Sequence, residues 1–286
     1  MILVFDIGGS RIKAAVWDGA LRPVGEVPTP AGDKAGFTAA IAGFVTGRER
    51  GIAISIAGVV DPATGEGTVA NIPAIDGLRL GPELQAAVGL PVKVLNDADC
   101  FALAEAARGA GRGHGTVLGV ILGTGVGGGL VIGGRLVTGA GGYAGEWGHG
   151  PVIRGDYALA CGCGQVGCVD TIGGARGLER LHQARTGQAL GAEDIVARWQ
   201  AGEGATLELW RDLVSGPLAL AVNLVGADVV PVGGGLSRAP GLVAWLDEAV
   251  RARILRRTVA PLVVPAECGA DAGLLGAAMA GQAEWG

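Results

Sequence analysis

The segment Gly145–Asp170 concentrates the residues best suited to hold a metal ion. It contains His149, Cys161, Cys163 and Cys168, which are three of the five cysteines and one of the three histidines of the chain. Three thiolates and one imidazole are the ligand set of a closed, tetrahedral structural zinc site. Their clustering in a cysteine-poor chain favours zinc over the alternative of scattered core cysteines and a surface histidine. Zinc binding, worth roughly 10–16 kcal/mol in such sites, would order a glycine-rich loop that buries little apolar surface.

The same loop carries Glu146, three residues before His149. A carboxylate and an imidazole edge on a metal-braced loop are suited to binding a polar ligand. The alternative of a zinc-dependent hydrolase, with His149 and the cysteines activating water, is disfavoured because four protein ligands leave no open coordination position.

A first glycine cluster joins two expected strands, Met1–Asp6 and Ile12–Trp17. The expected turn holds backbone N–H donors, a hydroxyl and two charged groups, in Asp6, Gly8, Gly9, Ser10 and Lys13. Unobstructed N–H groups bind phosphate oxygens, and an aspartate can hold a hydrated Mg²⁺ against them. This is not a P-loop, because no GxxxxGK[ST] motif is present. An ordinary hairpin turn is the equal alternative.

A second cluster follows the expected strand Val117–Leu122. Gly123, Gly125 and Gly128 match GxGxxG, but a further strand, Leu130–Ile132, follows where a dinucleotide fold requires a helix. We therefore expect a second phosphate-binding hairpin, with Thr124 as a hydroxyl donor. A third cluster, Gly233, Gly234 and Gly235, stands between a strand and a helix.

Asp97 lies between the expected strand Val92–Leu95 and the expected helix Ala98–Arg108. An aspartate at a helix start is a common cap. A carboxylate at the carboxyl end of a strand is also suited to act as the general base of phosphoryl transfer. The loop after another buried strand, with Gly58 and Asn71, is a further place where open α/β sheets bind ligands.

Composition narrows the class of protein. The 286 residues carry 17% charged residues and a net charge of −5, so nucleic acid and anionic membranes are poor partners. The N-terminus has no charged, then apolar, secretory pattern, and the apolar run Thr116–Gly133 is interrupted by glycines, which favours a hairpin over a membrane span. Cysteines in a metal pattern without a signal peptide predict a reducing cytoplasm.

Six segments together resemble the ROK family of bacterial sugar kinases and repressors. They are DIGGSRIK (6–13), LNDADCFALAEA (95–106), GVILGTGVGGGLVIGG (119–134), GEWGH (145–149), CGCGQVGC (161–168) and VGGGLS (232–237). Their order is that of the family, and CGCGxxGC is close to diagnostic. ANIPA (70–74) and VGGGLSRAP favour the members that act on N-acetyl-D-glucosamine.

The resemblance implies an α/β, two-domain actin-like ATPase (ribonuclease H-like) fold, with a cleft between the domains and a structural zinc loop. The implied domains are residues 1–112, joined by the last helix 272–286, and residues 113–271. It further implies ATP-dependent phosphorylation of a sugar at its 6-hydroxyl, with ATP, Mg²⁺ and structural Zn²⁺ as cofactors, and a homodimer.

By matching positions, Asp97 is the implied general base. The implied sugar contacts are Gly58, Asn71, Asn96, Asp97, Glu146, His149 and Asp170. The implied nucleotide contacts are Asp6, Gly8, Gly9, Ser10, Lys13, Gly123, Thr124, Gly125, Gly127, Gly233, Gly234 and Gly235. His149 is expected to use one ring nitrogen for zinc and the other for the sugar.

Two positions depart from the family pattern: Ser10 stands where threonine is usual, and Asp170 where glutamate is usual. Glucose and N-acetylmannosamine are alternative substrates, because one pocket contact discriminates by only about 1–3 kcal/mol. A sugar-responsive repressor is disfavoured, because the first strand begins at Ile2 and leaves no room for an N-terminal helix-turn-helix.

Overall fold

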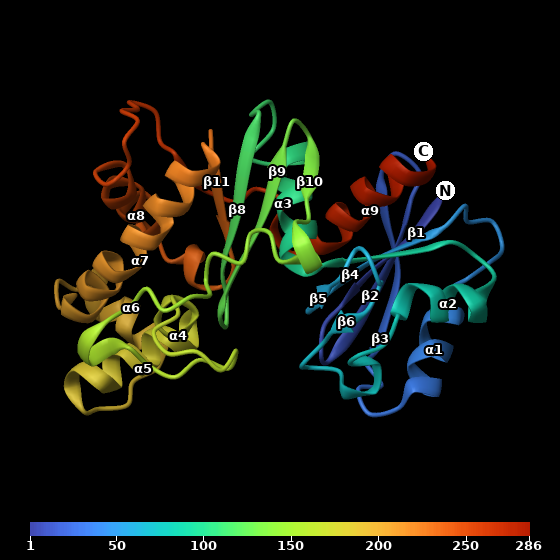
Figure 1. The fold of residues 1–286 in the computed structure, drawn as a ribbon, viewed down its shortest axis with the longest axis horizontal. Coiled ribbons are helices and arrows are strands. Elements are labelled where there is room, and N and C mark those ends of the chain that lie inside the picture. Colours follow the sequence, from blue (N-terminus) through green and yellow to red (C-terminus); the bar gives the residue numbers. More distant parts are fainter. The chain divides into compact units, whose positions relative to one another are not determined.

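The structure is a computed structural model that describes residues 1–286. The chain divides into two compact units (Figure 1). The first comprises residues 1–109, 134–144 and 268–286, and the second comprises residues 110–133 and 145–267. Residues 134–144, which were predicted to belong to the second domain, group with the first unit.

The main sheet of the first unit has the strand order β3-β2-β1-β4-β7. Its strands are β1 (Ile2–Ile7), β2 (Arg11–Trp17), β3 (Leu21–Pro28), β4 (Ile52–Ile56) and β7 (Val92–Asn96). Short strands β5 (Val59–Val60), β6 (Gly67–Thr68) and β10 (Arg135–Val137) complete the unit, with helices α1 (Lys34–Ala42), α2 (Leu80–Val88), α3 (Asp97–Arg108) and α9 (Ala272–Trp285). The predicted hairpin is confirmed, because β1 pairs antiparallel with β2, whereas β1, β4 and β7 run parallel.

Successive side chains of β1 point to opposite faces of this sheet. Leu3, Phe5 and Ile7 belong to a buried cluster that also contains Phe37 of α1 and Leu84 of α2. The opposite face packs against α9, which contacts β1 and β4 and lies beside α3 (Figure 1). Small residues of α9 allow this approach, since a Cβ on Gly276 would lie 1.9 Å from the carbonyl oxygen of Cys100.

The second unit repeats the plan of an antiparallel hairpin followed by parallel strands, and the hairpin predicted at its glycine cluster is confirmed. β8 (Thr116–Leu122) pairs antiparallel with β9 (Val126–Ile132), and parallel with β11 (Val230–Gly233), which pairs with β12 (Val263–Pro265). The helices are α4 (Asp170–Gly173), α5 (Ala175–Thr186), α6 (Ala192–Gln200), α7 (Ala205–Val225) and α8 (Leu242–Arg251). Trp210 of α7 is fully buried in the core, and its indole N–H donates to the carbonyl of Gly173 at 3.0 Å.

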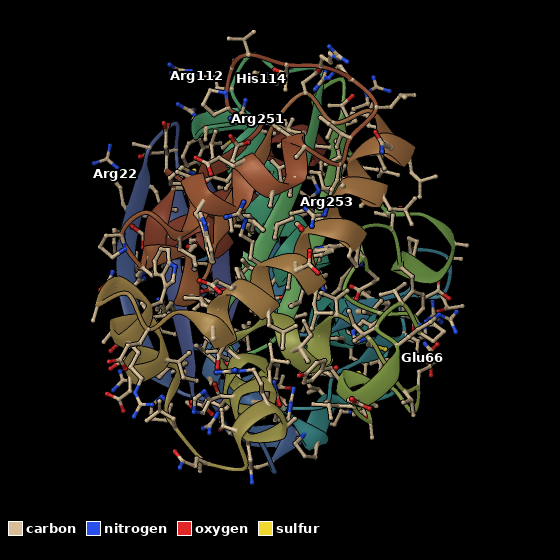
Figure 2. The ribbon with its side chains drawn as sticks, turned by 90° about the vertical axis from the view of Figure 1, so that its left-hand side faces the viewer. Arg22, Glu66, Arg112, His114, Arg251 and Arg253 are labelled. Carbon is tan, nitrogen blue, oxygen red and sulfur yellow. The ribbon has the colours of Figure 1, made fainter.

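Charged side chains lie at the outside of the units. Arg22 and Glu66 are exposed on the first, and Arg112 and His114 on the second (Figure 2). No helix combines the length and apolar character needed to cross a membrane. The run Thr116–Gly133 forms the β8–β9 hairpin, as expected.

Candidate active site and metal centre

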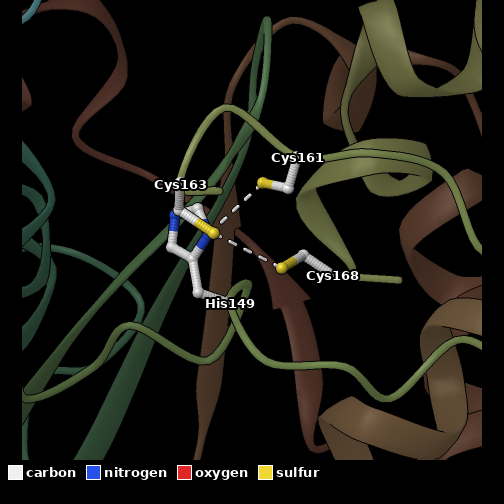
Figure 3. Close-up of side chains that lie close together, drawn as sticks. All are labelled: His149, Cys161, Cys163 and Cys168. Carbon is white, nitrogen blue, oxygen red and sulfur yellow. Dashed lines mark hydrogen bonds between the residues drawn. The ribbon is translucent and has the colours of Figure 1, made fainter. Parts of the chain in front are cut away.

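The four predicted metal ligands lie together in the second unit. The ligand atoms of His149, Cys161, Cys163 and Cys168 are all within 4.8 Å of one another (Figure 3). The Cys163 and Cys168 sulfurs are 3.7 Å apart, as are the Cys161 sulfur and the Nδ1 atom of His149. Two sulfurs bound to one tetrahedral zinc at about 2.3 Å would be separated by about 3.8 Å. Both the donor set and the spacing therefore fit a zinc ion.

Backbone hydrogen bonds fold the cysteine loop around this point. The N–H of Cys161 donates to the carbonyl of Gln165 at 2.8 Å, and residues 160 and 166 form a β-bridge. Gly167 has a φ of +84°, and a Cβ there would lie 2.2 Å from the carbonyl oxygen of Ile153. Glycine is required at this position, because both the left-handed conformation and the close contact exclude a side chain.

The thiols differ in acidity. The backbone N–H of Gln165 lowers the pKa of Cys163 to about 7. Burial raises the pKa of Cys161 to about 12. A bound divalent cation supplies the positive charge that holds coordinating thiols deprotonated. Zinc would thus let all three sulfurs act as thiolates.

His149 connects the metal ligands to a carboxylate. Its Nδ1 atom faces the Cys161 sulfur, and its Nε2 atom lies 3.8 Å from an oxygen of Glu146. The pKa of Glu146 is raised above its usual value, chiefly by burial. The neighbouring His149 opposes this rise, and Asp170 adds to it. The arrangement directs one imidazole nitrogen to the cysteine cluster and the other to Glu146, and the predicted contact of His149 with a sugar stays a prediction.

The glycine hairpin of the second unit adjoins this loop. Its tip is shorter than predicted, because Val126, Gly127 and Gly128 already belong to β9, and Gly127 pairs with Ile121. The indole N–H of Trp147 donates to the carbonyl of Gly127 at 3.1 Å, and a Cβ on Gly128 would lie 2.6 Å from the Trp147 ring. These glycines therefore make room for the indole beside the strand.

The third glycine cluster lies against the same hairpin. Gly234 has a φ of +93°, and a Cβ there would lie 2.4 Å from the carbonyl group of Leu122. Gly233 pairs with Ile121 of β8. The structure thus brings the predicted nucleotide-binding glycines of the second unit, Gly123–Gly127 and Gly233–Gly235, together at the ends of neighbouring strands.

In the first unit, the carboxyl ends of three parallel strands meet at one edge. Ile7 is in register with Ile56, and Ile56 with Asn96. Asp6 therefore lies at the same edge of the sheet as Asp97, which begins α3 directly after β7. Ligands bind at this edge in open α/β sheets.

Asn96, rather than Asp97, is the N-cap of α3. The Asn96 Oδ1 atom accepts the N–H groups of Ala98 at 2.7 Å and Asp99 at 3.1 Å, and its amide donates to the carbonyl of Gly58 at 2.9 Å. Asp97 accepts the N–H of Ala98 with Oδ1 at 2.9 Å. Asp97 lies in the first turn of α3, directly after β7, so its carboxylate has a location suited to a base without being the main cap.

The β1–β2 turn lies beside the loop that carries Asn71. A Cβ on Gly9 would lie 3.2 Å from the Cβ of Asn71, and the N–H of Gly8 donates to the carbonyl of Arg11 at 3.0 Å. Lys13 pairs across the hairpin with Asp6. The structure thus brings together, within the first unit, the predicted phosphate residues of the β1–β2 turn and the predicted sugar residue Asn71.

Sequence reasoning missed two residues that support this turn. The hydroxyl of Ser55, a fully buried residue, donates to Asp6 at 3.0 Å, and the hydroxyl of Thr29 donates to the carbonyl of Gly8 at 2.7 Å. Burial raises the pKa of Asp6. The hydrogen bond from Ser55 and the positive charge of Lys13 oppose this rise without cancelling it. A serine inside the apolar run GIAISIA was the available signal for Ser55.

Comparisons with known proteins match nearly the whole chain to one family. Residues 2–283 match the model of the ROK family. An N-acetyl-D-glucosamine kinase of Pasteurella multocida (strain Pm70) is 35% identical, with the match covering 96% of this chain and 97% of the relative. The N-acetyl-D-glucosamine kinase of Salmonella heidelberg (strain SL476) is 37% identical over the same shares.

Solved structures give the same result. A ROK hexokinase from Thermus thermophilus superposes with a TM-score of 0.88 at 33% identity, covering 100% of this chain and 99% of that one. A ROK family glucokinase from Streptomyces griseus, in complex with glucose and AMPPNP, gives 0.75 at 30% identity, covering 96% and 98%. These similarities confirm the predicted actin-like ATPase fold.

Proposed function

The chain belongs to the ROK family, and from this premise we propose that it transfers the γ-phosphoryl group of ATP to the 6-hydroxyl of N-acetyl-D-glucosamine. The observation that carries the proposal is 35% and 37% identity, over 96% of the chain, to two N-acetyl-D-glucosamine kinases. The position of Asp97 at the carboxyl end of β7 supports it, because a general base is required there.

The proposal assigns each predicted residue a role. It assigns the sugar to Gly58, Asn71, Asn96 and Asp97 in the first unit and to Glu146, His149 and Asp170 in the second. It assigns the phosphates to Asp6, Gly8, Gly9, Ser10 and Lys13 and to Gly123, Thr124, Gly125 and Gly127, and the adenosine to Gly233, Gly234 and Gly235. His149, Cys161, Cys163 and Cys168 hold a structural zinc ion.

In the reaction, the sugar 6-oxygen attacks the γ-phosphorus and forms the new P–O bond. The bond between the γ-phosphorus and the bridging oxygen breaks, ADP leaves, and Asp97 takes the hydroxyl proton. Backbone N–H groups of the glycine turns and Lys13 stabilise the phosphate charge. Mg²⁺, which accompanies the nucleotide, supplies further neutralisation of that charge. We expect the enzyme to work in the cytoplasm, which supplies ATP and keeps thiols reduced, and to form a homodimer.

A coupled ADP-release assay with N-acetyl-D-glucosamine, glucose and N-acetylmannosamine tests the substrate. We expect the highest kcat/KM with N-acetyl-D-glucosamine; a higher value with either other sugar would replace it as the substrate.

Asp97→Asn tests the base. The change keeps the acceptor for the Ala98 N–H and should lower kcat by roughly 10²–10⁴-fold, the usual contribution of a general base, while sugar affinity is retained. Asp33→Asn is the matched control, because Asp33 precedes α1 and makes no side-chain capping bond. Near wild-type kcat in Asp97→Asn would remove Asp97 from the mechanism.

A further inference from the structure

Asp170 makes a contact that its predicted sugar role does not account for. Its Oδ1 atom accepts the backbone N–H of Val126, the first residue of β9, at 2.8 Å. Its own N–H donates to the carbonyl of Gly148 at 2.9 Å. A Cβ on Gly125 would lie 2.4 Å from Oδ1, so the carboxylate reaches Val126 only because residue 125 is glycine.

The residues that follow Asp170 hold the rest of the hairpin tip. The N–H of Ala175 donates to the carbonyl of Gly123 at 2.8 Å, and the N–H of Arg176 donates to that of Thr124 at 3.2 Å. A Cβ on Gly174 would lie 2.6 Å from the carbonyl oxygen of Gly125. The tip therefore docks on a single segment, residues 170–176.

This segment continues directly from a metal ligand. Cys168 lies two residues before Asp170, and its carbonyl accepts both the N–H of Thr171 at 3.1 Å and the Thr171 hydroxyl at 2.7 Å. The N–H of Gly173 donates to the carbonyl of Val169 at 2.7 Å. Cys168 and Asp170 thus belong to one hydrogen-bonded turn, in which displacement of the cysteine displaces the aspartate.

We propose that Asp170 is a positioning residue for the glycine hairpin, through which the order of the Cys3His loop fixes the phosphate-binding tip Gly123–Gly125. This rests on the proposed function for the role of the tip, but the contact itself does not. The departure from glutamate has a physical reason here: one more methylene would move the carboxylate by about 1.5 Å, away from the 2.8 Å bond with Val126.

Hydrogen exchange of the zinc-loaded protein without substrates tests the contact. In Asp170→Ala the amides of the hairpin tip should exchange about tenfold faster, the lower end of what losing a hydrogen bond to a charged group costs. Asp170→Asn should exchange like the wild type, because the amide oxygen still accepts the Val126 N–H. Asp156→Asn, an exposed carboxylate of the same loop, is the control. Removal of zinc with a chelator should accelerate exchange at the same amides.

Binding measurements extend the test to function. The affinity for AMPPNP should fall about tenfold in Asp170→Ala and be retained in Asp170→Asn. If the alanine variant does not fold or does not retain zinc, Asp170→Glu replaces it, because glutamate keeps the charge but moves it away from Val126. We expect the same faster exchange and weaker AMPPNP binding in this variant. Wild-type exchange and AMPPNP affinity in a folded, zinc-loaded Ala or Glu variant would overturn the proposal. Failure of the wild type to phosphorylate any sugar would instead overturn the proposed function and leave the exchange result intact.

Discussion

Asn96 joins the start of α3 to the loop after β4, and its replacement should loosen both. Asn96→Ala removes the acceptor for the Ala98 and Asp99 N–H groups and the donor for the carbonyl of Gly58. Loss of an N-cap costs about 0.5–2 kcal/mol, and loss of a half-buried carbonyl's partner adds about 1 kcal/mol. We therefore expect the free energy of unfolding to fall by about 2 kcal/mol.

A second variant separates the two contributions. Asn96→Asp keeps an acceptor for the helix N–H groups, and its charge is favourable at the helix N-terminus, but it cannot donate to Gly58. Its loss should therefore be about 1 kcal/mol. Urea unfolding followed by circular dichroism measures both, and the midpoint of thermal unfolding should fall by about 4–8 °C for the alanine variant.

Two outcomes for the Asn96 variants would contradict these assignments. If the unfolding free energies of the Asn96→Ala and wild-type proteins agreed within about 0.5 kcal/mol, the range of substitutions that break no specific contact, Asn96 would not be the cap. Equal losses in the two variants would mean that only the Gly58 bond matters.

Three further changes test the remaining contacts. Cys168→Ser should abolish the binding of stoichiometric zinc, measured by atomic emission, and should make the loop 145–170 sensitive to protease. The control Cys268→Ser should leave the zinc content unchanged. Zinc retained by Cys168→Ser would exclude the proposed ligand set. Gly276→Ala should destabilise by about 2 kcal/mol or more through overpacking, since its Cβ would lie 1.9 Å from the Cys100 carbonyl oxygen. Gly32→Ala, at an exposed loop position with open space around the added Cβ, should change stability by no more than about 0.5 kcal/mol. Both are read from thermal unfolding, and equal effects would contradict the packing of α9 on α3. Burial alone would raise the pKa of Glu49, but hydrogen bonds from Thr46 and Gly47 outweigh it and lower that pKa. The stabilisation contributed by the Glu49 carboxylate should therefore be present at neutral pH and lost as the pH falls through its folded-state pKa, which lies below 4.5. The difference in unfolding free energy between the wild type and Glu49→Gln should then close on acidification. A difference that stays constant with pH would refute this.

The sequence predicted the features that rest on strong local patterns. The β1–β2 hairpin and α3 follow from apolar runs bounded by glycine, and the Cys3His cluster from its spacing. Strand β3 was missed, because it contains Pro23 and Gly25 and is largely exposed, so it lacks the alternation of a buried strand. The end of the β8–β9 turn was placed four residues late, at Leu130 instead of Val126, because glycines normally mark turns, whereas Gly127–Gly129 pair in the strand beside β8.

The tertiary contacts of single side chains could not be predicted. The sequence offered Asp97 as the helix cap, but both Asn96 and Asp97 are suitable residue types, and only the geometry distinguishes them. The bond between Asp170 and Val126 joins residues 44 positions apart, and no periodicity relates them. The role of Ser55 likewise depends on the register of β4 against β1.

The return of α9 to the first unit has a consequence for biosynthesis. This helix packs on β1, β4 and α3, so the N-terminal half of the sheet stays uncovered on one face until residues 272–285 leave the ribosome. Residues 110–133 and 145–267, which form the second unit, are all synthesised before α9. The second unit can therefore fold before synthesis is complete, and the first unit closes last, when α9 covers its sheet.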